Sequence, residues 1–483
     1  MSLADVAARG AAKTIGGQAV RITIQISGVV ILSRLLAPSD FGLVAMVTAV
    51  ANIALVLGDF GLSAATIQAK SITHRQRSNL FWTNVAIGVV LTLTVFLLSG
   101  PLASFYDEAQ VAPIAQALSA TLLLNAIGSQ FRAQLGRDLR FGWLAITDIV
   151  APAIALAVAV AAALAGFGVW SLVLQPITLA AATLAVLVCS ARWFPGWPGR
   201  APMRALYAFG AGTLGIRLAT YVSTNVDNII VGRYFGATTT GYYSRAYQLF
   251  QLPSQQIAGP AGRVLFPILS ILQDDHPRFE AYVLRAQLLF AYAVGGIFFA
   301  LAAGADPIVD IALGPGWDPA KPVFLALALG GIFQALTYNY MFVFQTKGLV
   351  GYQLRFSLVG RSIMVALLFA GIPFGIVGIA CASAAGQALM WALYTFIAAP
   401  RAGLSRRKLV KIPVAAYSMY AVATAAGLVV SRISDSLVAP AQLVLILATF
   451  VAVAAGAIIL VPRLRQELRI VRSTLARAVR SKA

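Results

Sequence analysis

Long apolar runs restrict the possible folds of this chain more than any other feature of its sequence. A helix needs about 20 apolar residues to cross a bilayer, whereas the strands of a membrane barrel are shorter and alternate in polarity. Only 11% of the 483 residues are charged and 60% are hydrophobic, while soluble domains carry about 25% charged residues. We therefore expect an all-α integral membrane protein. The runs predict fourteen transmembrane helices: Ile15–Leu36, Phe41–Ala64, Leu80–Leu98, Ile114–Gln134, Ala145–Ala165, Val169–Cys189, Leu206–Val231, Gly241–Ile257, Ala286–Ala305, Val323–Phe344, Phe356–Ile372, Ile376–Ala398, Ile412–Val430 and Leu443–Pro462.

The arginines and lysines of the loops predict the orientation. Such residues concentrate in the short loops on the cytoplasmic side of a membrane. If the N-terminus is cytoplasmic, the opposite loops hold only Arg34, Arg233, Lys321 and Arg432. Both termini are then predicted to be cytoplasmic. This distribution also accounts for the net charge of +20, so we expect no nucleic-acid partner.

Two stretches of the chain share one layout, which indicates an internal duplication. Arg34 precedes a turn and Gly42, and Arg233 precedes a turn and Gly241, with the same spacing in both copies. In transporters, repeats that enter the membrane from the same side are related by an axis along the membrane normal. We therefore predict two pseudo-symmetric six-helix lobes, 1–191 and 192–400, followed by two additional helices and a basic tail, 401–483.

Cysteine and histidine usage points away from metal, redox and catalytic sites. Cys189 and Cys381 lie within apolar runs, and His74 and His276 are the two histidines of the chain. The sequence contains no glycine-rich loop of the kind that cradles nucleotide phosphates. We expect no cofactor, no metal site and no catalytic residues.

The ordered motifs of the two copies resemble the polysaccharide transporters, or oligosaccharide/lipopolysaccharide flippases. These form a family in the multidrug/oligosaccharidyl-lipid/polysaccharide exporter (MOP) superfamily. Each motif alone consists of common residues, whereas the ordered set spans nearly all of the predicted twelve-helix core. The motifs are Arg34–Leu43, Gly58–Gln68, Gly166–Trp170, Asp227–Gly236, Gly241–Leu249 and Phe266–Ser270.

The resemblance implies export of a lipid-linked oligosaccharide across the bacterial inner membrane by alternating access. It implies undecaprenyl-diphosphate-linked repeat units for exopolysaccharide or lipopolysaccharide as the substrate. Membrane lipids, a polysaccharide polymerase and assembly proteins are the further partners that it implies.

Charged residues inside the predicted helices are the candidate site residues, because charges in hydrocarbon are costly and mostly functional. Arg21 and Arg217 lie in the opening helix of each lobe. The planar guanidinium can donate two parallel hydrogen bonds to a diphosphate, so both arginines are predicted to bind substrate. The alternative for Arg21 is that its side chain extends to the cytoplasmic surface.

Three acidic residues are candidates either for ion coupling or for structural pairing. They are Asp59, Asp148 and Asp227. Asp227 has Arg217 and Arg233 within reach along the chain, and the sequence leaves pairing and transport open. Asp59 lies beside Gly58 and Gly61, which favours a role at a helix end.

Two other functional classes fit part of the pattern. A membrane enzyme of polysaccharide assembly, either a polymerase or a glycosyltransferase, would need a sizeable outer loop or a cytoplasmic catalytic domain, and the loops here are short. A drug or small-cation exporter of the same fold is the second alternative. The excess of embedded arginines over acids favours an anionic substrate.

Overall fold

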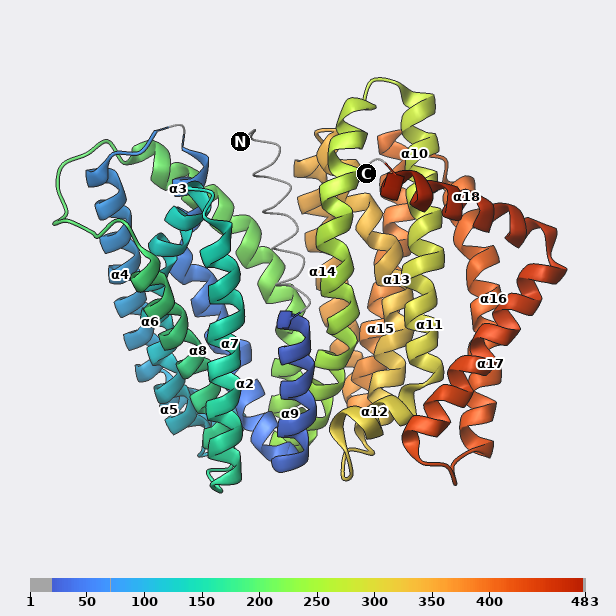
Figure 1. The fold of residues 1–483 in the computed structure, drawn as a ribbon, viewed down its shortest axis with the longest axis horizontal. Coiled ribbons are helices and arrows are strands. Elements are labelled where there is room, and N and C mark those ends of the chain that lie inside the picture. Colours follow the sequence, from blue (N-terminus) through green and yellow to red (C-terminus); the bar gives the residue numbers. More distant parts are fainter. Residues whose placement is uncertain (1–19, 70, 481–483) are drawn as a thin grey trace. The chain divides into compact units, whose positions relative to one another are not determined.

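A computed structural model describes residues 20–69 and 71–480, without the side chains of residues 59, 211–225, 255–264, 350, 354 and 472–480. Helices are the regular secondary structure of its described part, which divides into two compact units, Met1–Gly241 and Tyr242–Ala483 (Figure 1). The division falls inside a long helix, whereas the sequence predicts a lobe boundary at residue 192. That lobe boundary stays a prediction.

The first unit begins with a helix over residues 20–35, here called the first helix. It continues with α2 (Pro38–Asp59), α3 (Leu62–Gln68), α4 (His74–Leu97), α5 (Ser99–Tyr106), α6 (Val111–Arg137), α7 (Phe141–Leu164), α8 (Val169–Ser190) and the start of α9 (Arg204–Ile271). Helix α6 lies at its centre and contacts α2, α3, α4, α5, α7 and α8. Its core includes Met46, Val47, Val111, Ala115 and Val173, all of which are fully buried.

The predicted span Phe41–Ala64 is broken in the structure. Helix α2 ends at Asp59 and α3 starts at Leu62, and the two residues between them, Phe60 and Gly61, are in the left-handed region at φ of 43° and 66°. Helix α9 contains a similar interruption at Gly236, whose φ of 74° ends one helical segment and starts another. Glycine adopts such a backbone without a steric penalty, so a bend at this position costs little.

The connector at residues 191–203 is folded onto the first unit. Asn79 donates to the carbonyl of Gly199 and accepts from the amide of the same glycine, at 2.6 and 2.9 Å. Trp193 is buried against Phe81 and Phe131. The stretch therefore forms an ordered strap across the start of α4, although its composition is that of a loop.

The second unit contains the rest of α9 and then α10 (His276–Leu289), η1 (Phe290–Gly295), α11 (Gly296–Ala303), α12 (Ala305–Leu313), α13 (Ala320–Thr346), α14 (Val350–Gly371), η2 (Ile372–Phe374), α15 (Gly375–Leu393), η3 (Tyr394–Ala398), η4 (Ala399–Ala402), α16 (Arg406–Ile433), α17 (Ala439–Leu460) and α18 (Pro462–Arg480). Helix α13 is central and contacts α11, α14 and α15.

A π-helical turn, η1, provides the attachment for α16. The wider turn leaves backbone carbonyls available to other donors. The hydroxyl of Tyr420 donates to the carbonyl of Tyr292 within this turn. One turn further along α16, the hydroxyl of Thr424 donates to the carbonyl of Phe299 in α11, and both hydrogen bonds are 3.0 Å long. A Cβ on Gly296 would contact the Tyr420 ring at 3.0 Å, so the small residue gives the ring its place.

The basic tail, which the sequence left unassigned, folds as α18. Glu467 anchors this helix by accepting one hydrogen bond from the hydroxyl of Tyr292, at 2.8 Å, while Leu464 and Val471 are buried on one face. Its other face carries arginines. The helix crosses the ends of the neighbouring helices of its own unit (Figure 1), as an amphipathic helix does at a membrane surface.

Ten helical segments within the described residues are long and apolar enough to cross a membrane. One of these segments, Gly351–Ala402, contains two of the predicted spans. The predicted span Ile15–Leu36 begins outside the described residues and includes the first helix, and α9 contains two further predicted spans. Together they account for the fourteen-helix fold that the sequence predicts.

Candidate functional site

Helix α6 presents a polar face to a cleft inside the first unit. Asn125, Ser129 and Arg132 follow each other at intervals of four and three residues, which places them on one side of the helix. They line a cleft of about 450 Å³ together with Ser63 and Thr183 from α3 and α8. The remaining walls are apolar. A few convergent polar groups in an otherwise apolar cleft are typical of a ligand site. We call these five polar residues and their cavity the polar cleft.

An ion pair lies at one side of the polar cleft. Nη2 of Arg132 on α6 donates to Oδ1 of Asp148 on α7 at 2.8 Å, and the two side chains are 46% and 35% exposed. A guanidinium has five N–H groups, and the structure pairs only one of those of Arg132 within the described residues. The arginine therefore keeps donors for an anionic ligand while Asp148 holds it in place.

Neighbouring hydrogen bonds fix the polar face of α6. Asn84 on α4 donates to the hydroxyl of Ser129 at 2.6 Å. On the adjacent side of α6, Gln130 accepts from the hydroxyl of Thr66 at 2.9 Å. Both Asn84 and Gln130 are fully buried. Buried polar side chains that are bonded in this way hold the helix in one rotational setting.

Arg21 lies on the exposed surface of the first helix, two turns before the residue that packs on α7. A Cβ on Gly28 would contact Leu156 of α7 at 3.3 Å, and both helices run in the same direction in Figure 1. Arg21 precedes Gly28 by seven residues and Asp148 precedes Leu156 by eight, which are about 10 and 12 Å of helix rise. Arg21 therefore lies at about the depth of Asp148. Among the described residues, none makes a hydrogen bond or ion pair with the guanidinium of Arg21.

Asp227 is 5% exposed and accepts a hydrogen bond from the backbone amide of Asn228 at 2.9 Å. The side chains of Asp59 and Arg217 lie outside the described residues. Their roles, and that of Asp227 in transport, stay predictions.

Arg132 is the residue that the sequence analysis missed. It lies five residues before the end of α6, where basic residues also indicate orientation, so the sequence alone does not single it out as a site residue. The polar spacing of Asn125, Ser129 and Arg132 within an apolar run is the signal that would have found it.

Two other arginines of this region have structural roles. Nη1 of Arg137 donates to the carbonyls of Thr66 and Ala69 at the end of α3, at 2.8 and 2.6 Å. Nη1 of Arg140 donates at 2.7 Å to the carbonyl of Ser190 at the end of α8. Cations at helix C-termini satisfy the last carbonyls and complement the helix dipole. These arginines close the helices around the polar cleft.

Comparison with known proteins gives the family. The model of the polysaccharide biosynthesis protein family matches residues 31–322. The succinoglycan biosynthesis transport protein ExoT of Rhizobium meliloti is 27% identical over 300 residues, which are 62% of this chain and 61% of that protein. The lipopolysaccharide biosynthesis protein WzxC of Escherichia coli is 26% identical over 400 residues, with 78% of each chain covered. The match to ExoT thus spans about three fifths of that relative's length.

Solved structures with the same fold are also known. The lipid II flippase MurJ in an inward closed conformation aligns with a TM-score of 0.69 at 12% identity, covering 93% of this chain and 98% of MurJ. An inward-facing multidrug resistance transporter of the MATE family and the MOP superfamily aligns with a TM-score of 0.60 at 12% identity, covering 81% and 96%. At such identities the likeness concerns the fold. The chain thus belongs to the polysaccharide biosynthesis protein family and has the fold of MOP-superfamily transporters, as its ordered motifs predict.

Proposed function

We propose that this protein is a flippase that moves a lipid-linked oligosaccharide from the cytoplasmic to the periplasmic leaflet of the bacterial inner membrane. The observation that carries the proposal is an arginine with spare donors, Arg132, in a polar cleft within a transporter fold. The saccharide headgroup carries phosphate, and unpaired charge in hydrocarbon is very costly. A cationic cleft lowers that cost while the lipid tail remains in the bilayer.

The substrate in this proposal is an undecaprenyl-diphosphate-linked repeat unit for exopolysaccharide or lipopolysaccharide. Relatives named for succinoglycan and lipopolysaccharide biosynthesis support this class of substrate. The diphosphate is bound by Arg21 and Arg217, which open the two lobes. Arg132 extends the cationic path from the cytoplasmic end.

The decisive variant is Arg217→Lys. It keeps the charge but loses the fork that donates two parallel hydrogen bonds, so polysaccharide export should fall about tenfold or more. Export is measured in cells at matched membrane levels of each variant, with Arg75→Lys at an exposed position in the first turn of α4 as the control. If Arg217 instead only pairs with Asp227, the double variant Arg217→Ala/Asp227→Ala should recover export, since it removes the stranded acid. Such recovery, or full export by Arg217→Lys, would contradict the substrate role.

Lipid-linked intermediates in a deletion strain separate transport from enzymology. A flippase defect leaves the intermediates on the cytoplasmic leaflet. A polymerase defect leaves single repeat units on the periplasmic side, and a glycosyltransferase defect leaves them incomplete. The likeness to a multidrug transporter makes the drug exporter the second candidate. Efflux of cationic dyes by the purified protein in liposomes, with no movement of lipid-linked sugar, would favour it.

The energy source in this proposal is an ion gradient or the membrane potential. Asp59, Asp148 and Asp227 are the groups available to couple a cation. An outward-moving anion also gains about 2.3 kcal/mol per charge for each 100 mV of inside-negative potential. Reconstituted transport that is unaffected when both gradients and potential are collapsed would exclude active coupling.

A further inference from the structure

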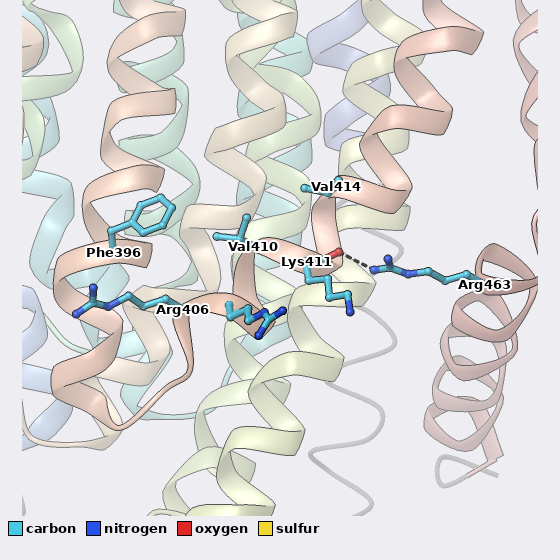
Figure 2. A pocket seen from close by; sticks show the side chains of 7 residues that line it. Phe396, Arg406, Val410, Lys411, Val414 and Arg463 are labelled. Carbon is cyan, nitrogen blue, oxygen red and sulfur yellow. Dashed lines mark hydrogen bonds between the residues drawn. The ribbon is translucent and has the colours of Figure 1, made fainter.

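A second cavity, of about 540 Å³, lies in the second unit where α16 begins. Arg406, Arg407 and Lys411 of α16 and Arg463 of α18 provide its cations, and Phe396 of η3 and Val410 and Val414 of α16 provide its apolar wall. Figure 2 shows Arg406 and Lys411 on one side and Phe396 and Val414 on the other. We call this cavity the α16 pocket.

The charges of the α16 pocket are unbalanced. Two carboxylates lie beside it, and each already has a cation: Glu280 accepts from Lys408 and Glu467 pairs with Arg463, at 2.8 and 2.9 Å. Within the described part of the chain, no carboxylate pairs with Arg406, Arg407 or Lys411. These three cations therefore have no ion-pair partner among the described residues.

The helix dipole increases this imbalance. Arg406, Arg407 and Lys411 occupy the first two turns of α16, where the helix carries its partial positive charge. Cations are favoured at the opposite, C-terminal end of a helix, so this position is unfavourable for them. The N-cap residue Ser405 makes no side-chain hydrogen bond to the first turn. The backbone amide of Ser405 donates to Glu280 at 3.2 Å, while Arg406, Arg407 and Lys411 lie in the turns that follow. Clustered cations at a helix start favour a bound anion.

The arrangement along α16 matches the shape of a lipid. Arg407, Lys411 and Val414 follow one another on one face of α16, and Val414 is 57% exposed. Phe396 is 47% exposed beside it. A phosphate headgroup fits the cationic turn and an acyl chain fits the valines and the phenylalanine deeper in the membrane. Free phosphate would use only the first of these features.

We propose that the α16 pocket binds the phosphodiester headgroup of an anionic phospholipid from the leaflet predicted to be cytoplasmic, with one acyl chain against Phe396 and Val414. Basic pockets between transmembrane helices on that side are suited to such headgroups. Arg463 also donates at 2.8 Å to the carbonyl of Lys411, so the lipid bridges two helices, α16 and α18, that this contact already joins. The lipid thereby fastens the amphipathic α18 to the bundle.

The test uses the purified full-length protein in neutral detergent, with phosphatidylglycerol or phosphatidylcholine added. Phosphatidylglycerol should raise Tm saturably and be retained in native mass spectrometry, because a ligand that binds only the folded state stabilises it. The variant Arg406→Gln/Arg407→Gln/Lys411→Gln should bind phosphatidylglycerol about 100-fold more weakly, from about fivefold per cation. The matched control is Arg75→Gln/Arg200→Gln/Arg204→Gln, which removes equal charge from exposed positions elsewhere and should bind like the parent.

Three further results decide the identity of the ligand. Phe396→Ala/Val414→Ala should weaken phosphatidylglycerol binding and leave any effect of inorganic phosphate unchanged. Equal stabilisation by inorganic phosphate and by phosphatidylglycerol would overturn the lipid assignment, and so would exclusive retention of undecaprenyl diphosphate. Equal phosphatidylglycerol binding by the pocket variant and the control variant would overturn the site. These measurements do not depend on transport, so they hold or fail separately from the proposed flippase function.

Discussion

Gly42 and Gly241 occupy equivalent positions where their two helices cross. At each position a Cβ would clash with the backbone of the other helix, four residues before the other glycine. A Cβ on Gly42 would overlap the carbonyl oxygen of Ala237, and one on Gly241 would overlap that of Pro38. The two residues are also the equivalent glycines of the sequence repeat. The contact is therefore reciprocal, as expected when duplicated segments pair around a local two-fold axis.

This crossing predicts a strong effect for a single methyl group. Gly42→Ala and Gly241→Ala should each destabilise the protein by about 3 kcal/mol or more, because the backbones must move apart. Gly142→Ala is the matched control, since nothing lies within 4 Å of the position of its Cβ. Size-exclusion profiles and Tm of the purified variants provide the measurement. A Gly42→Ala protein with the Tm of the Gly142→Ala control would contradict the close approach.

The Arg132–Asp148 pair predicts unequal effects of its two neutral variants on export. Arg132→Gln removes the donor to substrate and should reduce export about tenfold or more. Asp148→Asn leaves Arg132 charged and only loosens the position of its side chain, so it should reduce export less. Both variants should cost only about 1 kcal/mol of stability, because the pair is partly exposed. Full export in the swapped variant Arg132→Asp/Asp148→Arg would show that the pair is purely structural.

The orientation predicts where reporters fused to the chain will be active. Fusions after Gly199 and after Arg407 should read as cytoplasmic, and fusions near Glu108 and Asp318 as periplasmic, because Lys and Arg accumulate in cytoplasmic loops. Alkaline phosphatase and green fluorescent protein give opposite readouts for each position. A periplasmic signal after Arg407 would reverse the layout of the second lobe.

The ion pairs of Lys321, on the side predicted to be periplasmic, should make a pH-dependent contribution to stability. Its ammonium lies 2.9 Å from Asp310 and 2.7 Å from Asp318, and its hydrogen bond holds the pKa of the Asp318 carboxyl below its usual range. A depressed pKa stabilises the fold above the unfolded pKa of about 4, and this contribution is lost as the pH falls through the folded value. Lys321→Gln should lower the free energy of unfolding at pH 7 by about 1 kcal/mol or less, and with it Tm slightly. The difference from the parent should shrink toward pH 3, and a difference that stays constant would exclude the ionic contribution.

The sequence predicted the all-helical membrane fold well because membrane burial leaves strong, periodic signals. Apolar runs indicate spans one by one, and the equal spacing of Arg34–Gly42 and Arg233–Gly241 indicates the duplication. The break at Phe60–Gly61 was missed because the residues on both sides are equally apolar. Helix α18 was missed because its many arginines hide the buried pair Leu464 and Val471, seven residues apart.

The candidate site was predicted less completely, for a different physical reason. An arginine near a helix end looks the same in sequence whether it marks the cytoplasmic side, caps another helix or faces a cleft. Arg132, Arg137 and Arg140 do different things within nine residues, and only contacts from α3, α7 and α8 tell them apart. Partners distant in sequence decide each role.

The strap at residues 191–203 also determines which part of the chain can yield. The strap is held by two hydrogen bonds to Asn79 and by the buried Trp193. It therefore gives the sixth and seventh predicted spans little freedom to move apart. If the two predicted repeats move against each other during transport, we expect the bend to occur within α9 at Gly236, whose backbone already departs from the helix. The connector would then act as the fixed element and the helix as the hinge.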